Sequence, residues 1–173
     1  MSRPTNECQR RLGQFLRKEL AGWMGLPVGC TAQAVAGWLP IRPGEGTANL
    51  GGDLVAYRFR ALEAAGFTEP VRLYFHEGNL ALVRSGLWSA DRDECARLVK
   101  DQGEPPDRLS LVFGMGTIAD GEWVYAARGL TLAVIPATGL IAGVYVYPPC
   151  DFDTYRRRLH HNQPARELPK RGA

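Results

Sequence analysis

The sequence predicts an α+β domain in which a helix followed by an antiparallel meander of strands occurs twice in tandem. Apolar residues first recur at steps of three and four, which is typical of an amphipathic helix, and then at steps of two, which is typical of half-buried strands. The same change of spacing occurs again in the second half of the chain. We therefore expect helices packed on one face of a curved sheet, with extra helices at the N and C termini.

The 173 residues divide into four segments that we expect to form one compact domain overall. Residues 1–25 carry an N-terminal amphipathic helix, residues 26–88 a first αβ repeat, residues 89–150 a second αβ repeat, and residues 151–173 a C-terminal helix with a basic tail. With 45% hydrophobic residues, a chain of this length is expected to bury enough apolar surface to fold without a metal or a disulfide.

Two helices are predicted at the start of the first segments. The first spans Thr5–Trp23 on the basis of its apolar face, and Thr5 or Asn6 is suited to cap it by accepting hydrogen bonds from unpaired amides. A shorter helix is capped by Thr31 and ends before Pro40, because proline cannot continue a helix.

Strands follow wherever apolar and polar residues alternate. They are expected at residues 55–60, 71–76, 80–84, 108–113, 122–126, 130–135 and 140–147. Between the two sets of strands lies a predicted helix over Asp91–Lys100, capped by Ser89 or Asp91, and a last helix begins at Asp151 or Asp153.

Equivalent signals recur in both halves of the chain. A proline ends the helical part at Pro40 and again at Pro105, and an aromatic strand follows at Tyr57 and again at Trp123. A glycine-containing turn then separates the next two strands in each half. The proline and the aromatic strand are a similar distance apart in both halves, as expected for a duplicated supersecondary unit.

The segment Val28–Pro40, with the sequence VGCTAQAVAGWLP, resembles the Gly-x-Thr, Val, Leu-Gly-x-Pro start of the helix in the β-lactamase-inhibitor-protein-like fold. The outer-membrane assembly lipoproteins of the BamE type share that start. Over residues 26–147 the resemblance implies helices on a short antiparallel sheet, carried twice in the inhibitor, with an open sheet face that holds a partner or ligand. The chain departs from these families in having no lipobox and no clear counterpart of the inhibitor's cysteine pairs.

Alternation along the strands predicts which side chains lie on the open side of the sheet. If Leu73 and Phe75 face the helices, Arg72, Tyr74 and His76 face away from them. The predicted partner-binding set is Arg58, Arg60, Arg72, Tyr74, His76, Tyr145 and Tyr147. Tyrosine and arginine are enriched at binding hot spots. An ordinary solvated face, with arginine stems over apolar surface, accounts for the same pattern.

Composition and charge disfavour several classes of protein. The formal net charge is only +3, so we expect no nucleic-acid partner. No segment approaches the roughly 20 apolar residues of a membrane span, and the first residues have no apolar signal core. The four cysteines lie far apart and have no histidine at ligand spacing, which predicts reduced and mostly buried thiols at Cys8, Cys30, Cys95 and Cys150. We therefore expect a cytoplasmic protein.

No motif for a metal or a cofactor stands out, and we expect neither. The segment Gly114–Thr117 follows a predicted strand but leads into a turn and another strand, unlike a nucleotide-binding loop. The carboxylate pairs lie at helix starts or turns, where capping explains them: Asp91/Asp93, Asp120/Glu122 and Asp151/Asp153. His76, at a strand end beside Glu77, is the histidine best placed for acid–base chemistry.

Two functions remain open. The first is a non-enzymatic protein-binding module, such as an immunity, inhibitor or accessory protein, which uses the face of arginines and tyrosines. The alternative is a small cofactor-free enzyme of specialised metabolism, of cyclase or isomerase type, in which Tyr74, His76 and Arg72 supply acid, base and oxyanion stabilisation to a small-molecule substrate. A closed, solvent-filled apolar pocket beside His76 favours the enzyme, and a flat, filled sheet argues against it.

Overall fold

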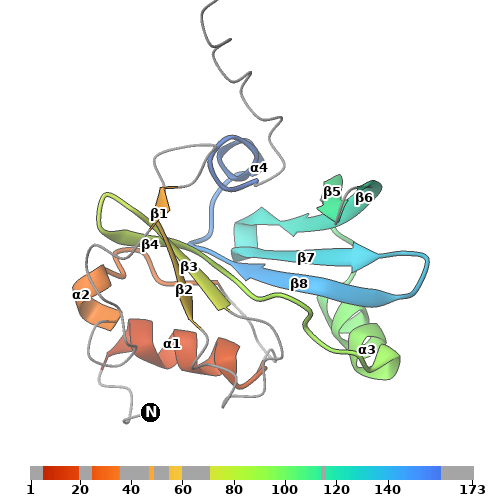
Figure 1. The fold of residues 1–173 in the computed structure, drawn as a ribbon, viewed down its shortest axis with the longest axis horizontal. Coiled ribbons are helices and arrows are strands. Elements are labelled where there is room, and N and C mark those ends of the chain that lie inside the picture. The colour runs from red at the N-terminus through yellow and green to blue at the C-terminus, as the bar shows by residue number, and fades with distance from the viewer. Residues whose placement is uncertain are drawn as a thin grey trace, which may run out of the picture.

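The computed structural model describes residues 6–19, 25–35, 47–48, 55–59, 71–113 and 116–160. These residues form an α+β structure with an antiparallel sheet, as the sequence predicts (Figure 1). The helices and helical turns are α1 (Glu7–Leu16), α2 (Ala32–Val35), α3 (Arg92–Gln102), η2 (Ala126–Arg128), α4 (Phe152–Thr154) and η3 (Tyr155–Leu159). The strands are β1 (Thr47–Ala48), β2 (Val55–Phe59), β3 (Val71–His76), β4 (Asn79–Arg84), β5 (Asp107–Phe113), β6 (Gly116–Tyr125), β7 (Leu130–Ile135) and β8 (Leu140–Val146).

Two sets of strands meet in one sheet, whose order is β1-β2-β3-β4-β8-β7-β6-β5. The two sets join at the centre, where Val83 pairs with Val146 and Arg84 pairs with Tyr145. In each half at least one helix precedes the strands along the chain, which is the predicted order of elements. The duplication of a common unit and the curvature of the sheet stay predictions.

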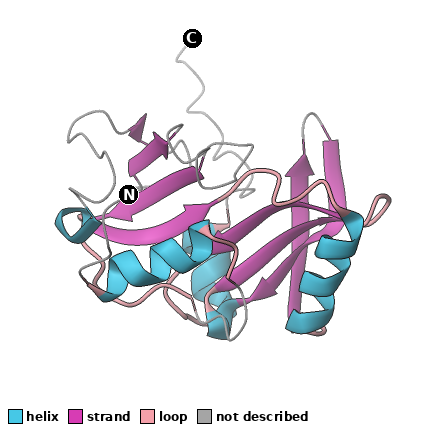
Figure 2. Ribbon diagram, turned by 90° about the horizontal axis from the view of Figure 1, so that it is seen from below, coloured by secondary structure: helices cyan, strands magenta, loops and turns pink. Residues whose placement is uncertain are grey.

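One face of the sheet is covered by α1, α2 and α3 (Figures 1 and 2). Leu12 and Phe15 of α1 and Leu98 of α3 belong to the same buried cluster as Leu73 and Leu132 of the sheet. Apolar residues at steps of two on the strands and of three on α1 thus meet in one core, as the sequence pattern predicts.

The opposite face is covered in part by α4 and η3, which lie on the other side of the sheet from α1 in Figure 1. Tyr155 of η3 is fully buried, and the centre of its ring lies 4.9 Å from that of Tyr147. Phe152 and Leu159 pack against the same cluster. The face that we expected to be open is therefore closed over part of its area.

The predicted helix caps are confirmed. The Asn6 side-chain oxygen accepts a hydrogen bond from the Gln9 amide, and the Thr31 hydroxyl oxygen accepts one from the Ala34 amide. Asp91 caps α3, since its side-chain oxygen accepts hydrogen bonds from the Asp93 and Glu94 amides. At α4 the capping residue is Asp151 and not Asp153.

Two predicted boundaries are wrong for a local backbone reason. The α1 helix ends at Leu16, because Lys18 adopts the left-handed conformation with φ of 58°, which an α-helix cannot continue through. The turn expected around residues 118–121 is part of β6, where Asp120 has φ of 52° and the β5–β6 register shifts. Residues 36–46 and 60–70, which include Pro40 and Arg60, lie outside the described ranges.

A disulfide joins Cys8 to Cys30, so the prediction that all four cysteines are reduced is wrong for this pair. Their Cα atoms lie 5.6 Å apart, within the range of natural disulfides. The bond ties α1 to the loop before α2. Spacing along the sequence could not reveal it, because the packing of separate elements brings the two residues together. Cys95 and Cys150 are free, and Cys95 is buried as predicted.

A bulge in β4 decides which of its side chains lie together. Phe75 pairs with Leu80 and Tyr74 pairs with Leu82, so Ala81 is the extra residue. Leu80 therefore lies with the helix-covered core, whereas Leu82 lies with the tyrosine cluster on the other face. The same shift leaves Arg84 opposite Arg72, on the side of the sheet that carries Tyr74.

Candidate functional site

Arg84 is the centre of a polar contact network on the tyrosine side of the sheet. Its two terminal nitrogens each donate to a tyrosine hydroxyl, one to Tyr74 and one to Tyr145, both at 3.4 Å. The guanidinium carbon also lies 4.6 Å from the centre of the Tyr145 ring, a cation–π distance. Burial raises the pKa of the Tyr145 hydroxyl, so this neighbour stays neutral and does not balance the charge on Arg84.

Three arginines stand opposite one another across neighbouring strands. Arg58 of β2 pairs with Arg72 of β3, and Arg72 pairs with Arg84 of β4. We call Arg58, Arg72 and Arg84 the arginine row. The Arg72 side chain is exposed and that of Arg84 is half-buried, and no carboxylate of the described residues forms an ion pair with either.

The predicted partner-binding residues are brought together in part. Tyr74, Tyr145 and Tyr147 do share one face, but each is at most 5% exposed, so the prediction that they line an open surface is wrong. Tyr147 is buried beneath Tyr155, and its hydroxyl donates to the Leu130 carbonyl oxygen. The C-terminal helical turn supplies Tyr155, which covers Tyr147, and no pattern within the strands could show where this turn packs.

The other predicted residues are placed as follows. Arg72 is exposed, and His76 is half-buried at the end of β3. For Arg58 the structure gives the backbone position in β2, and Arg60 lies outside the described residues. Arg84, which completes the row, was not predicted, because strict alternation along β4 without the bulge puts it on the same face as Leu80.

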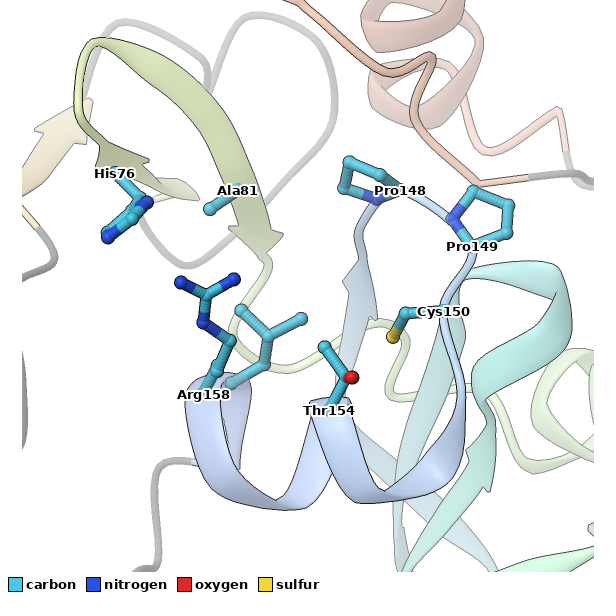
Figure 3. Close-up of a pocket in the computed structure, with 8 residues that line it drawn as sticks. His76, Ala81, Pro148, Pro149, Cys150, Thr154 and Arg158 are labelled. Carbon is cyan, nitrogen blue, oxygen red and sulfur yellow. The ribbon is translucent and has the colours of Figure 1, made fainter.

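A cavity of about 180 Å³ lies beside His76, between the β3–β4 hairpin and the C-terminal helical turn (Figure 3). Its lining is mostly apolar: Ala81, Pro148, Pro149, Cys150 and Leu159, together with His76, Thr154 and Arg158. Figure 3 shows the Arg158 guanidinium reaching from the helical turn toward the hairpin, and the Cys150 sulfur directed into the space.

The acid–base trio considered for an enzyme is not assembled around this cavity. Of His76, Tyr74 and Arg72, only His76 is among the lining residues. Cys150 is no better suited to nucleophilic catalysis, because burial and the neighbouring Asp151 raise the pKa of its thiol and keep it protonated. The pocket expected of an enzyme beside His76 is therefore present, but without Tyr74 and Arg72 in its lining.

A second polar cluster is buried under the C-terminal turn, where Glu122 of β6 has no exposed surface. The Tyr155 hydroxyl donates to Glu122 Oε1 at 2.7 Å, and His160 Nδ1 contacts Glu122 Oε2. This cluster fastens the end of the described chain to the sheet. We expected Glu122 where a turn leads into the strand 122–126, and the signal that could have shown its burial is its two-residue step to the buried Val124 in that strand.

The described ranges contain no group of three or more histidine, cysteine or acidic residues that could hold a metal ion. No helix within these ranges is long and apolar enough to cross a membrane. The glycine segment at residues 114–117 joins two paired strands, since Phe113 lies opposite Gly116, and no helix follows to present its N-terminus to a phosphate.

Comparison with family models, with curated proteins and with solved structures finds no match to this chain. The resemblance of residues 28–40 to the β-lactamase-inhibitor-protein-like fold therefore stays a prediction, and the function is argued below from the residues alone.

Proposed function

We propose that this protein is a non-enzymatic binding module that recognises an acidic segment of a partner protein through the arginine row. The observation that carries the proposal is the register, which sets Arg58, Arg72 and Arg84 opposite one another with no described carboxylate paired to Arg72 or Arg84. Such a module would serve its partner as an inhibitor, immunity protein or accessory protein.

Like charges directly opposite on neighbouring strands repel each other, so the pairing of Arg72 with Arg84 is expected to lower the stability of the isolated protein. An anion bound over the row removes this repulsion. Carboxylates in particular accept two parallel hydrogen bonds from one guanidinium, which makes arginine a strong and geometrically selective partner. Arg84 is already positioned by the Tyr74 and Tyr145 hydroxyls, so it loses less side-chain freedom on binding.

The length of the row favours a chain of carboxylates over a single one. Neighbouring strands lie about 4.8 Å apart, so a row across three strands spans about 10 Å. One carboxylate contacts one or two guanidinium groups over that distance. An extended segment with several aspartates or glutamates is long enough to cross all three strands, and the net charge of +3 favours its approach.

The proposal is tested by titrating the protein into a fluorescein-labelled peptide of ten glutamates and following fluorescence anisotropy at low ionic strength. We expect Arg72→Glu to weaken binding at least tenfold. Arg97→Glu is the matched control, because Arg97 is an exposed arginine of α3 and its replacement changes the net charge equally. Equal losses in the two variants, or no binding by the unaltered protein, would show that the row is not the recognition site.

We also propose that the protein works in an oxidising compartment, and not in the cytoplasm as expected from the sequence. The Cys8–Cys30 disulfide supports this, because such bonds persist in oxidising surroundings and are rare where glutathione keeps thiols reduced. The state of these two thiols in protein taken directly from its host, blocked with iodoacetamide before lysis, tests the point. Alkylation of both would place the protein in a reducing compartment.

A further inference from the structure

The cavity beside His76 is made by two parts of the chain that are far apart in sequence. One wall is the β3–β4 hairpin, with His76 and Ala81, and the other is the segment from Pro148 to Leu159. The bulge at Ala81 contributes to the space, because it places a small side chain where the hairpin faces the helical turn. The Glu122 contacts with Tyr155 and His160 hold the second wall against the sheet.

The lining has two chemical characters. Ala81, both prolines and Leu159 offer an apolar surface, whereas the His76 imidazole and the Arg158 guanidinium lie together at the side of the hairpin (Figure 3). Among the described residues no carboxylate forms an ion pair with Arg158, and Asp153 on the same helical turn pairs with Arg156. A ligand that satisfies both parts has an apolar body and one negative charge.

The volume limits the size of that ligand. About 180 Å³ is slightly more than the roughly 150 Å³ of an engineered cavity that binds benzene, and less than the roughly 300 Å³ at which pockets for drug-sized molecules begin. The space therefore holds one ring, or a short alkyl chain, with a carboxylate group attached.

We propose that this cavity is a binding site for a small monocarboxylate, of the arylcarboxylate or short-chain carboxylate type, whose charge pairs with Arg158 beside His76 and whose apolar body lies against Ala81, Pro148, Pro149 and Leu159. The site is separate from the arginine row, as neither Arg72 nor Arg84 lines the cavity. The arginine row takes an acidic protein segment, and the cavity takes a small molecule.

The probe for this site is benzoate, with benzamide as a neutral molecule of the same shape. In two-dimensional ¹H–¹⁵N spectra, benzoate is expected to shift the amide signals of Ala81, Cys150 and Leu159, and benzamide to bind at least tenfold more weakly. Arg158→Met, which keeps an unbranched apolar side chain and removes the charge, is expected to weaken benzoate binding at least tenfold. Arg157→Met is the matched control, because the neighbouring Arg157 is exposed and does not line the cavity.

Three results would overturn the proposal. They are benzoate shifts that miss every lining residue, equal binding of benzoate and benzamide, and equal losses in Arg158→Met and Arg157→Met. Ala81→Leu gives an independent check, because the larger side chain fills the cavity and is expected to abolish binding while the spectrum stays that of a folded protein. Arg72→Glu is expected to leave benzoate binding unchanged, which separates this site from the arginine row.

Discussion

The Cys8–Cys30 disulfide gives the sharpest energetic prediction, because its contribution can be worked from the loop it closes. The two cysteines are 22 residues apart in sequence. In the chain-entropy model, closing a loop of that length in the unfolded state stabilises the folded state by about 3 kcal/mol. We therefore expect a variant with Cys8→Ala and Cys30→Ala to lose about 3 kcal/mol of unfolding free energy, measured by urea denaturation.

A count of thiols checks the bond itself. Protein unfolded in guanidinium without reductant is expected to show two reactive thiols, those of Cys95 and Cys150, and reduction beforehand is expected to raise the count to four. Adding reductant to the double alanine variant should leave its stability unchanged. Four thiols without reduction, or a double variant as stable as the oxidised parent, would refute the reasoning.

Three further predictions concern the C-terminal turn and two glycines with positive φ. Tyr155→Phe removes the hydrogen-bond donor to the fully buried Glu122 carboxyl group and is expected to lower the free energy of unfolding in urea by about 1–3 kcal/mol. The control is Tyr125→Phe, expected to cost about 1 kcal/mol, because the Tyr125 hydroxyl donates to the Gly103 carbonyl oxygen. The Thr154 amide and hydroxyl donate to Asp151 and lower its pKa, so Asp151 stabilises the fold above its unfolded-state pKa and this contribution is lost as the pH falls through the folded-state value. Asp151→Asn keeps the cap without the titration and should lose less stability than the parent between about pH 5 and about pH 2, whereas parallel curves would contradict this account. Gly129 and Gly139 share nearly the same left-handed φ, 69° and 70°, but a Cβ at Gly129 would fall on the Tyr147 carbonyl oxygen and one at Gly139 would meet nothing. Gly129→Ala is therefore expected to cost about 1–3 kcal/mol more than Gly139→Ala in thermal or urea unfolding, and equal costs would show that the close approach does not matter.

Much of the fold could be predicted from local pattern. The strands 71–76 and 130–135 form where alternation predicts them, because successive side chains point to opposite faces, toward the helix-covered core on one side and the tyrosine cluster on the other. In 140–146 a register shift at Ala142 interrupts the alternation, so Ile141 and Val144 both lie in the helix-covered core. The caps Asn6, Thr31 and Asp91 could be predicted because a short polar side chain at a helix start has one dominant use, accepting hydrogen bonds from free amides.

The candidate site depends on two features that the local sequence pattern cannot predict. The bulge at Ala81 reverses the faces of β4, and only this reversal explains how Leu80 faces the helices while Arg84 lies with Tyr74. Periodicity marked Tyr145 and Tyr147 as one face, but the packing of the C-terminal turn determines that this face is buried. Both features depend on contacts between residues distant in sequence.

The most direct test of the arginine row is to observe its side chains while an acidic segment binds. In protein labelled with ¹⁵N-arginine, the side-chain Nε–Hε signals of Arg72 and Arg84 are expected to shift as the ten-glutamate peptide is added, and that of Arg97 to stay in place. The signals are assigned by single arginine-to-lysine variants. Shifts confined to Arg156 and Arg157 of the C-terminal turn, with Arg72 and Arg84 unmoved, would contradict the proposed function.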